Sequence, residues 1–510
     1  MADTVTVPLR SESDMSMKSI VRDLIICVSI TMLFLMAGCS GGNSAAPGFT
    51  LPDAADYSTL TWTNAFTSAH GKLAREYPFT TWNGVDWPGL YSRFLPRIQQ
   101  AQNAGDEKAY YLALHEYIFS IPDGHVSLTA SVTTTLTSVT LERAGGGFGL
   151  AVAELDDHRV IAAAVITGDT AAQAGIKAGA EIVSWGGLPV LTAIDRIEIG
   201  TIPYRTLTYE YSPNSESSRA TSVFSRLEQA RLLTRGALDS KISVEFRNPG
   251  SADLQTVTLT AGFDDGRTLS LLNFAARPLF SDQINYRITP EGYGYLRLRA
   301  EIDLTDYSRY PVELFQKFRE AMDSFVAAGV PGVILDLRGN YGGSDKLAAD
   351  LCGFFYSSQQ IYERQYIYDK RDGSFAGYDE LIITPYPPPT PHYGGSVVVL
   401  VNPGTISSGE GPAAFIKKLP NGAVIGFHGT NGSFGMAGGE IMMPGGYNIK
   451  YPYGRSEDQS GVVQLDSRNG VGGVAPTVRV PKTAENVLAY AAGTDVELAY
   501  AISYLREKIQ

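Results

Sequence analysis

The hydrophobic pattern of residues 56–120 has the period of an α-helix. Apolar side chains recur three and four positions apart in residues 91–98 and again in residues 109–118, which is the spacing of one helix face. Asp86 precedes a Trp-Pro pair, and this order is typical of a helix start. We therefore predict an N-terminal helical domain over residues 56–135, ending in a turn that enters a strand.

After about residue 140 the pattern changes to short runs of β type. A short helix closed by glycine is predicted at residues 171–176, and the remaining runs alternate or are briefly apolar. Strands are predicted at residues 160–166, 181–185, 243–246 and 255–259. We expect a β-rich domain over residues 140–265.

From about residue 285 onward, predicted strands and helices alternate. Buried strands are expected at residues 294–299, 332–337, 396–401 and 423–427, and helices at residues 310–328, 345–355 and 413–419. This βαβ order favours a parallel sheet covered by helices. The core domain should span residues 280–510 and end in a surface helix at residues 496–509.

The N-terminus has the pattern of an export signal. Residues 24–37 are strongly apolar, follow Lys18 and Arg22, and form a run too short for a comfortable membrane span. Small residues precede Cys39, an arrangement that resembles a bacterial lipobox. We expect a signal peptide over residues 1–38, lipid modification of Cys39, a flexible tether over residues 39–55, and a place in the bacterial cell envelope as a membrane-anchored lipoprotein, on the periplasmic or outer face. A plain signal peptide or a short anchor helix is the alternative.

Composition narrows the function classes. The chain has 510 residues, 44% hydrophobic and 18% charged, so it is globular and long enough for two or three domains. A net charge of -12 with no basic stripe argues against nucleic acid as a partner. Three cysteines give the mature fold no disulfide framework. No His, Cys and Asp cluster has ligand spacing, so we expect no metal and no cofactor.

The most informative segment is residues 402–412. It is a Gly-rich stretch with Ser407 between a predicted buried strand and a predicted helix. Such a turn exposes a hydroxyl and places the free N–H groups of a helix start beside it, which suits a nucleophile. An ordinary Ser/Gly turn that caps a helix is the alternative.

Three separated segments together resemble the tail-specific (C-terminal processing) and tricorn-core serine peptidases. They are residues 333–343, similar to the oxyanion loop of that family, residues 405–410, similar to its nucleophile turn, and residues 123–125, similar to the histidine turn of the tricorn-like branch. Residues 147–150 and 168–176 resemble a PDZ domain. The resemblance extends from about residue 56 to the C-terminus. It implies an α/β multidomain fold with an N-terminal helical unit, a PDZ-like β-rich domain and a βαβ, crotonase-like catalytic core.

The resemblance also implies a catalytic base. The tail-specific branch uses a lysine about twenty-five residues after its serine, but Gly432 occupies that position here. A histidine is the natural substitute, and His125 lies in the matching turn of the tricorn-like branch. His428 is the alternative base, and His125 could instead hold its turn by hydrogen bonding.

The resemblance also implies an acid partner for the histidine and an oxyanion hole. The tricorn-like branch supplies an acid roughly sixty residues after the serine, and Asp466 is the nearest acid in this chain. Glu410 matches the glutamate of the nucleophile turn and is expected to organise that turn. The backbone amides of Gly342 or Gly343 and of Ser408 are the expected oxyanion donors.

Two further features of the sequence concern the residue before His125 and the PDZ-like loop. The tricorn pattern has a serine before its histidine, whereas Gly124 stands here, so Ser127 is a candidate replacement. The PDZ-like loop formed by Gly147, Phe148, Gly149 and Leu150 is expected to bind a peptide C-terminus, although it could be an ordinary hairpin.

These observations predict an exported, lipid-anchored serine endopeptidase that cleaves polypeptides through Ser407 and His125. The alternative is a catalytically inactive protein on the same scaffold that binds peptides or hydrophobic ligands. Another acyl hydrolase is less favoured, because no Gly-x-Ser-x-Gly elbow is present. The sequence sets neither the substrate nor the oligomeric state.

Overall fold

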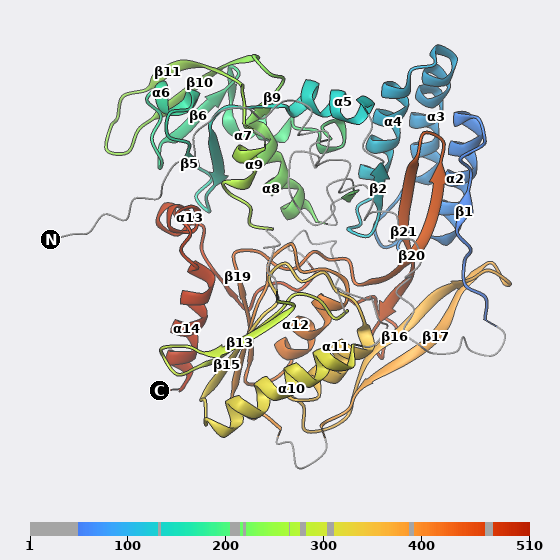
Figure 1. The fold of residues 1–510 in the computed structure, drawn as a ribbon, viewed down its shortest axis with the longest axis vertical. Coiled ribbons are helices and arrows are strands. Elements are labelled where there is room, and N and C mark those ends of the chain that lie inside the picture. The colour runs from blue at the N-terminus through green and yellow to red at the C-terminus, as the bar shows by residue number, and fades with distance from the viewer. Residues whose placement is uncertain are drawn as a thin grey trace, which may run out of the picture.

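The computed structural model describes residues 49–130, 134–203, 215–217, 221–264, 266–275, 282–302, 311–386, 392–464 and 473–509. Figure 1 shows a helical layer and a β-rich middle unit side by side above a core built mainly from the residues after 282. The predicted signal peptide and Cys39 lie outside the described residues.

The helical layer consists of three helices with polar N-caps. They are α2 (Trp62–Glu76), α3 (Trp87–Ala104) and α4 (Glu107–Phe119). The Asp86 side chain accepts a hydrogen bond from the Gly89 amide, as the sequence predicts for a helix start. Phe66 and Phe94 lie edge-on to Tyr117, with ring centroids 5.1 and 5.6 Å apart, and all three rings are buried. These aromatic contacts join the three helices into one layer.

The chain leaves α4 through residues 120–126 and enters β2 (Ser127–Ala130). β2 pairs with β21 (Tyr447–Glu457) on one side and with β8 (Ser215–Ser217) on the other. The rest of this sheet is β1 (Ala55–Asp56), β20 (Gly435–Met443), β16 (Gln360–Asp369) and β17 (Ser374–Ile383), in the order β1-β20-β21-β16-β17. The sheet thus ties the helical layer to the core.

The middle unit contains an antiparallel sheet in the order β11-β10-β6-β5-β4. Its strands are β4 (Leu150–Glu154), β5 (Val160–Val165), β6 (Glu181–Trp185), β10 (Lys241–Arg247) and β11 (Gln255–Thr260), with β7 (Leu188–Pro189) beside β6. A small second sheet pairs β12 (Gly262–Phe263), β3 (Gly146–Gly147) and β9 (Arg235–Gly236). Its helical segments are α5 (Thr134–Ala144), α6 (Thr170–Gln173), α7 (Val190–Asp195), η2 (Ile199–Thr201), α8 (Ser222–Leu233) and α9 (Arg267–Ser270).

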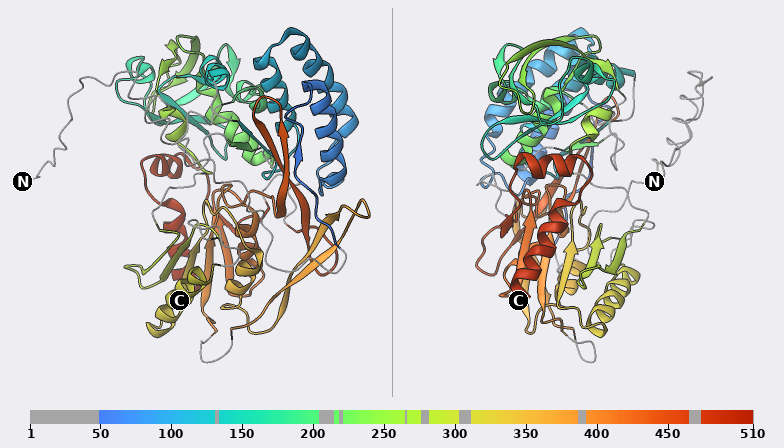
Figure 2. Two further views of the ribbon diagram at one scale, coloured as in Figure 1. Left: turned by 45° about the vertical axis from the view of Figure 1, so that its right-hand side comes forward. Right: turned by 90° about the vertical axis from the view of Figure 1, so that its left-hand side faces the viewer.

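The core sheet has the predicted parallel strands. Its order is β13-β14-β15-β18-β19-β22, and only β13 runs antiparallel to its neighbour. The strands are β13 (Ile284–Ile288), β14 (Gly294–Leu298), β15 (Gly332–Asp336), β18 (Ser396–Leu400), β19 (Gly422–Gly426) and β22 (Val478–Arg479). Helices α10 (Val312–Ala327), α11 (Asp345–Cys352) and α12 (Glu410–Lys417) cover one face, and α13 (Ala484–Ala491) and α14 (Val496–Ile509) cover the other. Figure 2 shows α10 and α14 on opposite sides of the sheet.

Two expectations about core helices need correction. The last helix, α14, is not simply a surface helix, because Ala501 and Leu505 are fully buried against the sheet. α12 begins at Glu410 rather than at residue 413, since a 3₁₀ turn, η4 (Ser407–Gly409), leads straight into it. The nucleophile turn is therefore joined to the helix without an intervening loop.

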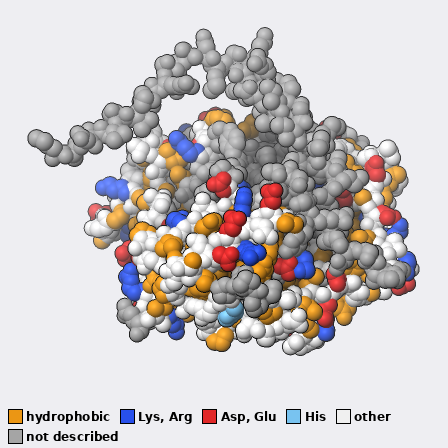
Figure 3. Space-filling model, turned by 60° about the horizontal axis from the view of Figure 1, so that its bottom comes forward, with side chains coloured by type: hydrophobic (Ala, Val, Ile, Leu, Met, Phe, Trp, Pro, Cys, Tyr) orange, Lys and Arg blue, Asp and Glu red, His pale blue; other side chains and the backbone are white. Residues whose placement is uncertain are grey.

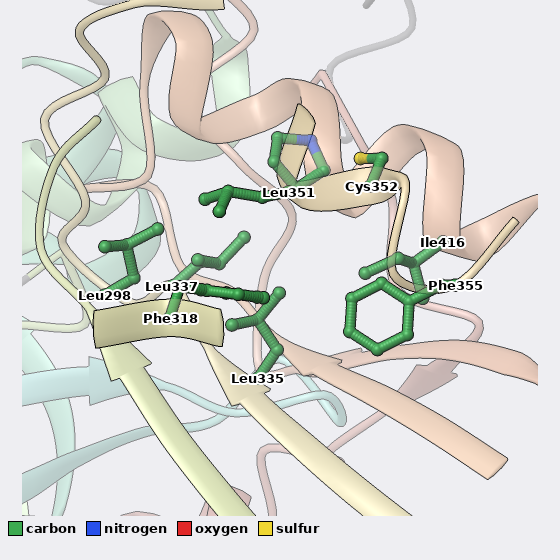
Figure 4. A pocket seen from close by; sticks show the side chains of 9 residues that line it. Leu298, Phe318, Leu335, Leu337, Leu351, Cys352, Phe355 and Ile416 are labelled. Atoms are coloured by element: carbon green, nitrogen blue, oxygen red, sulfur yellow. The ribbon is translucent and has the colours of Figure 1, made fainter. Parts of the chain in front are cut away.

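The apolar side chains between α11, α12 and the sheet pack so closely that no space for a ligand remains (Figure 4). Cys352 lies among them, next to Leu351 and Phe355. Burial raises the pKa of the Cys352 thiol well above its ordinary value, so this thiol stays protonated and unreactive. α11 and α12 thus form a rigid support for the residues at their N-termini.

On the face shown in Figure 3, basic and acidic side chains are interspersed with apolar ones. Among the described helices, none is both long and apolar enough to serve as a membrane span.

Candidate active site

Ser407 has a strained backbone conformation at the junction of β18 and α12. Its φ is +60°, in the left-handed region that residues with a Cβ rarely adopt. Such a conformation costs about 1–3 kcal/mol and persists only where the surroundings enforce it. Ser407 is partly exposed, whereas Ile406 and Ser408 on either side are buried. The turn therefore presents one hydroxyl to solvent from a buried frame.

Hydrogen bonds to the loop that follows β15 hold this turn on both sides of Ser407. The Thr405 hydroxyl donates to the Leu337 carbonyl at 2.7 Å. The Ile406 amide donates to the Asn340 carbonyl at 3.0 Å. The Ser408 hydroxyl donates to the Gly343 carbonyl at 2.9 Å. Because the bonds flank the strained residue, they fix its φ without engaging its side chain.

Gly342 and Gly343 allow this close approach. A Cβ at Gly342, where φ is +79°, would lie 2.6 Å from the Cβ of Ser407. A Cβ at Gly343 would lie 2.5 Å from the carbonyl carbon of Glu301. Real Cβ atoms do not come this close to other heavy atoms, so both positions require glycine.

The backbone amides around Ser407 differ in whether they already donate a hydrogen bond within the protein. The Gly342 amide donates to the Asn340 side-chain oxygen at 2.7 Å. The Gly343 and Ser408 amides have no protein acceptor among the residues that the structure describes. They remain available to bind a negative oxygen beside the Ser407 hydroxyl, while Gly342 supplies the close approach.

Asn340 and Glu301 support the loop, and the sequence interpretation identified neither. The Asn340 amide group donates to the Glu301 carboxyl at 2.8 Å and to the Leu298 carbonyl at 3.1 Å. Both side chains are fully buried, and burial raises the pKa of Glu301 to about 8. Asn340 directly follows Gly339 within the motif at residues 333–343. This position is the one signal in the sequence that could have identified it.

The turn that carries His125 packs directly against the nucleophile turn. The Gly124 amide donates to the Ser433 hydroxyl oxygen at 2.8 Å. A Cβ at Gly124 would lie 2.3 Å from the Asn431 side-chain oxygen and 2.9 Å from the Cδ1 atom of Ile406. The structure therefore brings the segments of His125 and Ser407 together, although they are far apart in the sequence.

Three carboxyl groups interact electrostatically with His125, and Asp123 is the one within ion-pair distance of its ring. The Asp123 Oδ1 atom lies 3.6 Å from Nδ1 of His125. Asp345 begins α11, and burial raises the pKa of its carboxyl to about 6, an effect that the charge of His125 opposes. Burial likewise raises the pKa of Glu410 to about 7, against hydrogen bonds and the charge of His125. The side chain of His125 itself is only 10% exposed.

Glu410 organises the loop at residues 430–433. Its carboxyl accepts from the Thr430 hydroxyl at 2.6 Å and from the amides of Gly432 and Ser433, each at 2.8 Å. Gly432 occupies the position of the lysine in the tail-specific branch, so this loop contributes backbone donors instead of an amine. Lys417 is engaged elsewhere, since its Nζ donates to the Ala475 carbonyl at 2.6 Å.

The alternative base, His428, has a different setting. Its ring is buried edge-on to Phe274, with centroids 5.4 Å apart. Burial, together with the positive charges of Lys482 and Arg479, lowers its pKa to about 3. A group with so low a pKa is a weak base near neutral pH.

Two other predicted residues remain, Asp466 and Ser127. Asp466 lies outside the described residues. Ser127 is buried on β2, opposite Lys450 of β21. The described residues contain no group of three or more His, Cys, Asp or Glu side chains that could hold a metal ion.

The loop predicted to bind a peptide terminus leads into β4, the edge strand of the middle sheet. Gly147 ends β3, Gly149 has a φ of +74°, and Leu150 begins β4. Phe148 is buried against Trp185, and its amide donates to the Thr234 carbonyl at 3.1 Å. The loop thus adjoins an unpaired strand edge in the described part of the chain.

Comparisons with known proteins concern the family and the fold of this chain. Residues 293–480 match the model of Peptidase family S41, and this stretch contains Ser407 and the loop that ends at Gly343. The structure of mature CPAF complexed with lactacystin is 14% identical, with a TM-score of 0.55 over 87% of this chain and 98% of that one. Another structure of mature CPAF is 13% identical, with a TM-score of 0.57 over 88% of this chain and 96% of that one. At this identity the structures show a common fold. No curated protein sequence matches the chain significantly.

Proposed function

We propose that this chain, which belongs to peptidase family S41 and is a serine peptidase, cleaves polypeptides with Ser407 as nucleophile and His125 as general base. The observation that carries the proposal is the packing of the Gly124–His125 turn against Ile406 and Ser433. It joins a histidine from the turn between α4 and β2 to the strained serine of the core.

In this mechanism His125 accepts the proton of the Ser407 hydroxyl as the oxygen attacks the scissile carbonyl. The negative charge that develops on the carbonyl oxygen is stabilised by the amides of Gly343 and Ser408, which have no other acceptor in the described region. Losing one such donor typically costs about 3 kcal/mol of transition-state stabilisation. His125 then returns the proton to the leaving amine, and water hydrolyses the acyl-enzyme by the same route.

The experiment is labelling with a fluorophosphonate probe, combined with turnover of an unfolded protein substrate. We expect the wild-type protein to be labelled at Ser407. Ser407→Ala and His125→Ala should each abolish labelling and turnover. His158→Ala is the matched control, because this histidine side chain is 79% exposed on the middle unit. Loss of labelling in His428→Ala alone would move the base to His428.

A folded wild-type protein that is neither labelled nor active, but binds peptides, would favour the inactive scaffold. The fact that supports this alternative is that Nδ1 of His125 has no hydrogen-bond partner among the described residues.

We further propose that the enzyme is exported and anchored by a lipid on Cys39. This rests on the apolar run at residues 24–37 and the small residues before the cysteine. Metabolic labelling with a fatty-acid analogue should modify the wild-type chain and spare Cys39→Ser.

The loop at residues 147–150 is proposed to bind the free C-terminus of a substrate as an added strand on β4. A peptide with a free C-terminal carboxylate should therefore bind more tightly than the same peptide with an amidated end. Equal affinity for the two peptides would argue for an ordinary hairpin.

A further inference from the structure

We infer that Asp123 is the carboxylate that positions the His125 ring for proton transfer. The inference rests on the proposed role of His125 and names its orienting partner. It places that partner in the turn between α4 and β2, outside the stretch of the core that matches the family model.

The geometry around Nδ1 of His125 carries the argument. This atom is shielded from solvent and has no hydrogen-bond partner in the described part of the chain. Its near acceptor is Oδ1 of Asp123 at 3.6 Å, a few tenths of an ångström beyond hydrogen-bond distance. A buried ring nitrogen without a partner is costly, so closing this gap is favourable. Engaging Nδ1 in this way leaves Nε2 for the serine hydroxyl.

Asp123 is itself held in place, which a positioning group requires. Its side chain is only 1% exposed. Oδ1 accepts from the backbone amide of His125 at 2.8 Å, and Oδ2 accepts from the Tyr77 hydroxyl at 3.0 Å. Burial raises the pKa of Tyr77 well above its ordinary value, so the hydroxyl remains a donor. The Asn83 side-chain amide extends this series of hydrogen bonds by donating to the Tyr77 hydroxyl oxygen at 2.8 Å.

Two other carboxyl groups face His125 from the core, Asp345 on α11 and Glu410 on α12. Glu410 is engaged by the hydroxyl of Thr430 and by the amides of Gly432 and Ser433. Asp345 interacts electrostatically with the buried carboxyl of Glu363. The Oδ1 atom of Asp345 has no hydrogen-bond partner among the described residues, and its carboxyl lies beyond ion-pair distance of the His125 ring. Both therefore contribute charge near the ring, whereas Asp123 approaches the ring nitrogen itself.

The first test measures the coupling without catalysis. In the full-length Ser407→Ala protein, NMR follows the protonation of the His125 ring with pH, with His125→Ala identifying its signal. Adding Asp123→Asn should move the titration midpoint to lower pH, because the imidazolium loses a neighbouring negative charge. Asp466→Asn, the variant at the acid position implied by the family resemblance, should leave the midpoint in place.

The second test uses the enzyme with its serine intact. Asp123→Asn should lower kcat by about 10²- to 10⁴-fold with little change in KM, and should move the acidic limb of kcat/KM to lower pH. Asp106→Asn is the matched control: it removes one carboxylate from the helical layer, and asparagine caps a helix as well as aspartate does.

The outcomes separate this inference from the proposed function. If Asp123→Asn leaves both the ring titration and kcat unchanged, the inference is overturned, and an effect of Asp466→Asn would then assign the role to Asp466. If Asp123→Asn does not fold, Tyr77→Phe replaces it, because that variant keeps the carboxylate and loses its donor. Tyr77→Phe should lower kcat by about tenfold, and an unchanged kcat overturns the inference. Failure of the proposed function shows instead as labelling that survives His125→Ala.

Discussion

The backbone amide of Gly124 donates a hydrogen bond of 2.8 Å to the side-chain oxygen of Ser433, which lies 309 residues further along the chain. Ser433 belongs to the loop that Glu410 holds through the amides of Gly432 and Ser433. By its resemblance to the tail-specific branch, this loop has Gly432 at the position of the lysine base. Here the loop anchors the turn of the proposed histidine base through the Ser433 hydroxyl.

This relationship predicts a specific effect of Ser433→Ala. The Gly124 amide would lose its acceptor in a buried setting, at a cost of about 1–3 kcal/mol. Part of that cost should appear as a displaced His125, and we expect kcat to fall by about tenfold with KM nearly unchanged. Steady-state kinetics measure this, with Ser92→Ala on α3 as the control for losing a hydroxyl in the helical layer. A kcat equal to that of the wild type would mean that the bond does not position the turn.

A second prediction concerns the contact between Gly342 and Ser407. In Gly342→Ala the new Cβ would meet the Cβ of Ser407 at 2.6 Å in a backbone conformation that disfavours alanine. The loop must move, so fluorophosphonate labelling should slow by at least about 10²-fold.

Gly329→Ala is the matched control for that experiment. Gly329 also has a positive φ, +62°, but a Cβ there meets no atom within 4 Å. Its substitution should lower the free energy of unfolding by about 1 kcal/mol and leave the labelling rate unchanged. Equal labelling rates in the two variants would show that the close approach at Gly342 is dispensable.

The parallel strands of the core were predictable because they are buried on both faces. β15 and β18 are continuous apolar runs in the sequence, and the structure pairs Leu335 with Val399 between them. The strained serine turn was predictable from its glycines and from its place between a strand and a helix. Local sequence is enough in both cases.

The sheet that contains β2, β20 and β21 was not predicted, because β2 is far from the other two strands in the sequence. β21 is buried along most of its length, so it lacks the alternation that marks a half-exposed strand. Its partner β2 lies in the first third of the chain, where Ser127 pairs with Lys450. Asn340 and Glu301 escaped notice for a similar reason: their importance depends on a contact between the ends of two strands.

The positive φ of Ser407 leads to a third prediction. Ser407→Gly should remove the strain that any Cβ suffers at a φ of +60°, whereas Ser407→Ala keeps it. Both variants should lose labelling. The free energy of unfolding of the glycine variant should be about 1 kcal/mol higher than that of the alanine variant. Chemical denaturation of the two proteins measures the difference. A less stable glycine variant would mean that the turn is not strained in solution.

The fourth prediction is a pH dependence of stability that comes from Glu301. This carboxyl is fully buried, and burial raises its pKa to about 8 in the folded protein, while it titrates near its ordinary value in the unfolded chain. Because the folded-state value is the higher one, the folded protein binds the proton more tightly. The contribution of Glu301 protonation to the free energy of unfolding is therefore complete below about pH 4.5 and is lost as the pH rises toward 8.

The substitution Glu301→Gln isolates this effect, because glutamine can still accept the hydrogen bond from Asn340 but cannot ionise. Denaturant unfolding at pH 5, 6, 7 and 8 should show the wild-type free energy falling by several kcal/mol more than that of the variant. Glu410, whose pKa burial raises to about 7, adds its own slope to both proteins, so the difference between the two curves reports Glu301 together with its electrostatic coupling to Asp345. Glu320→Gln, at an exposed position of α10, should follow the wild-type curve. Parallel curves for wild type and Glu301→Gln would show that the buried carboxyl does not gain its proton on folding, and that Asn340 holds the loop against a charged partner.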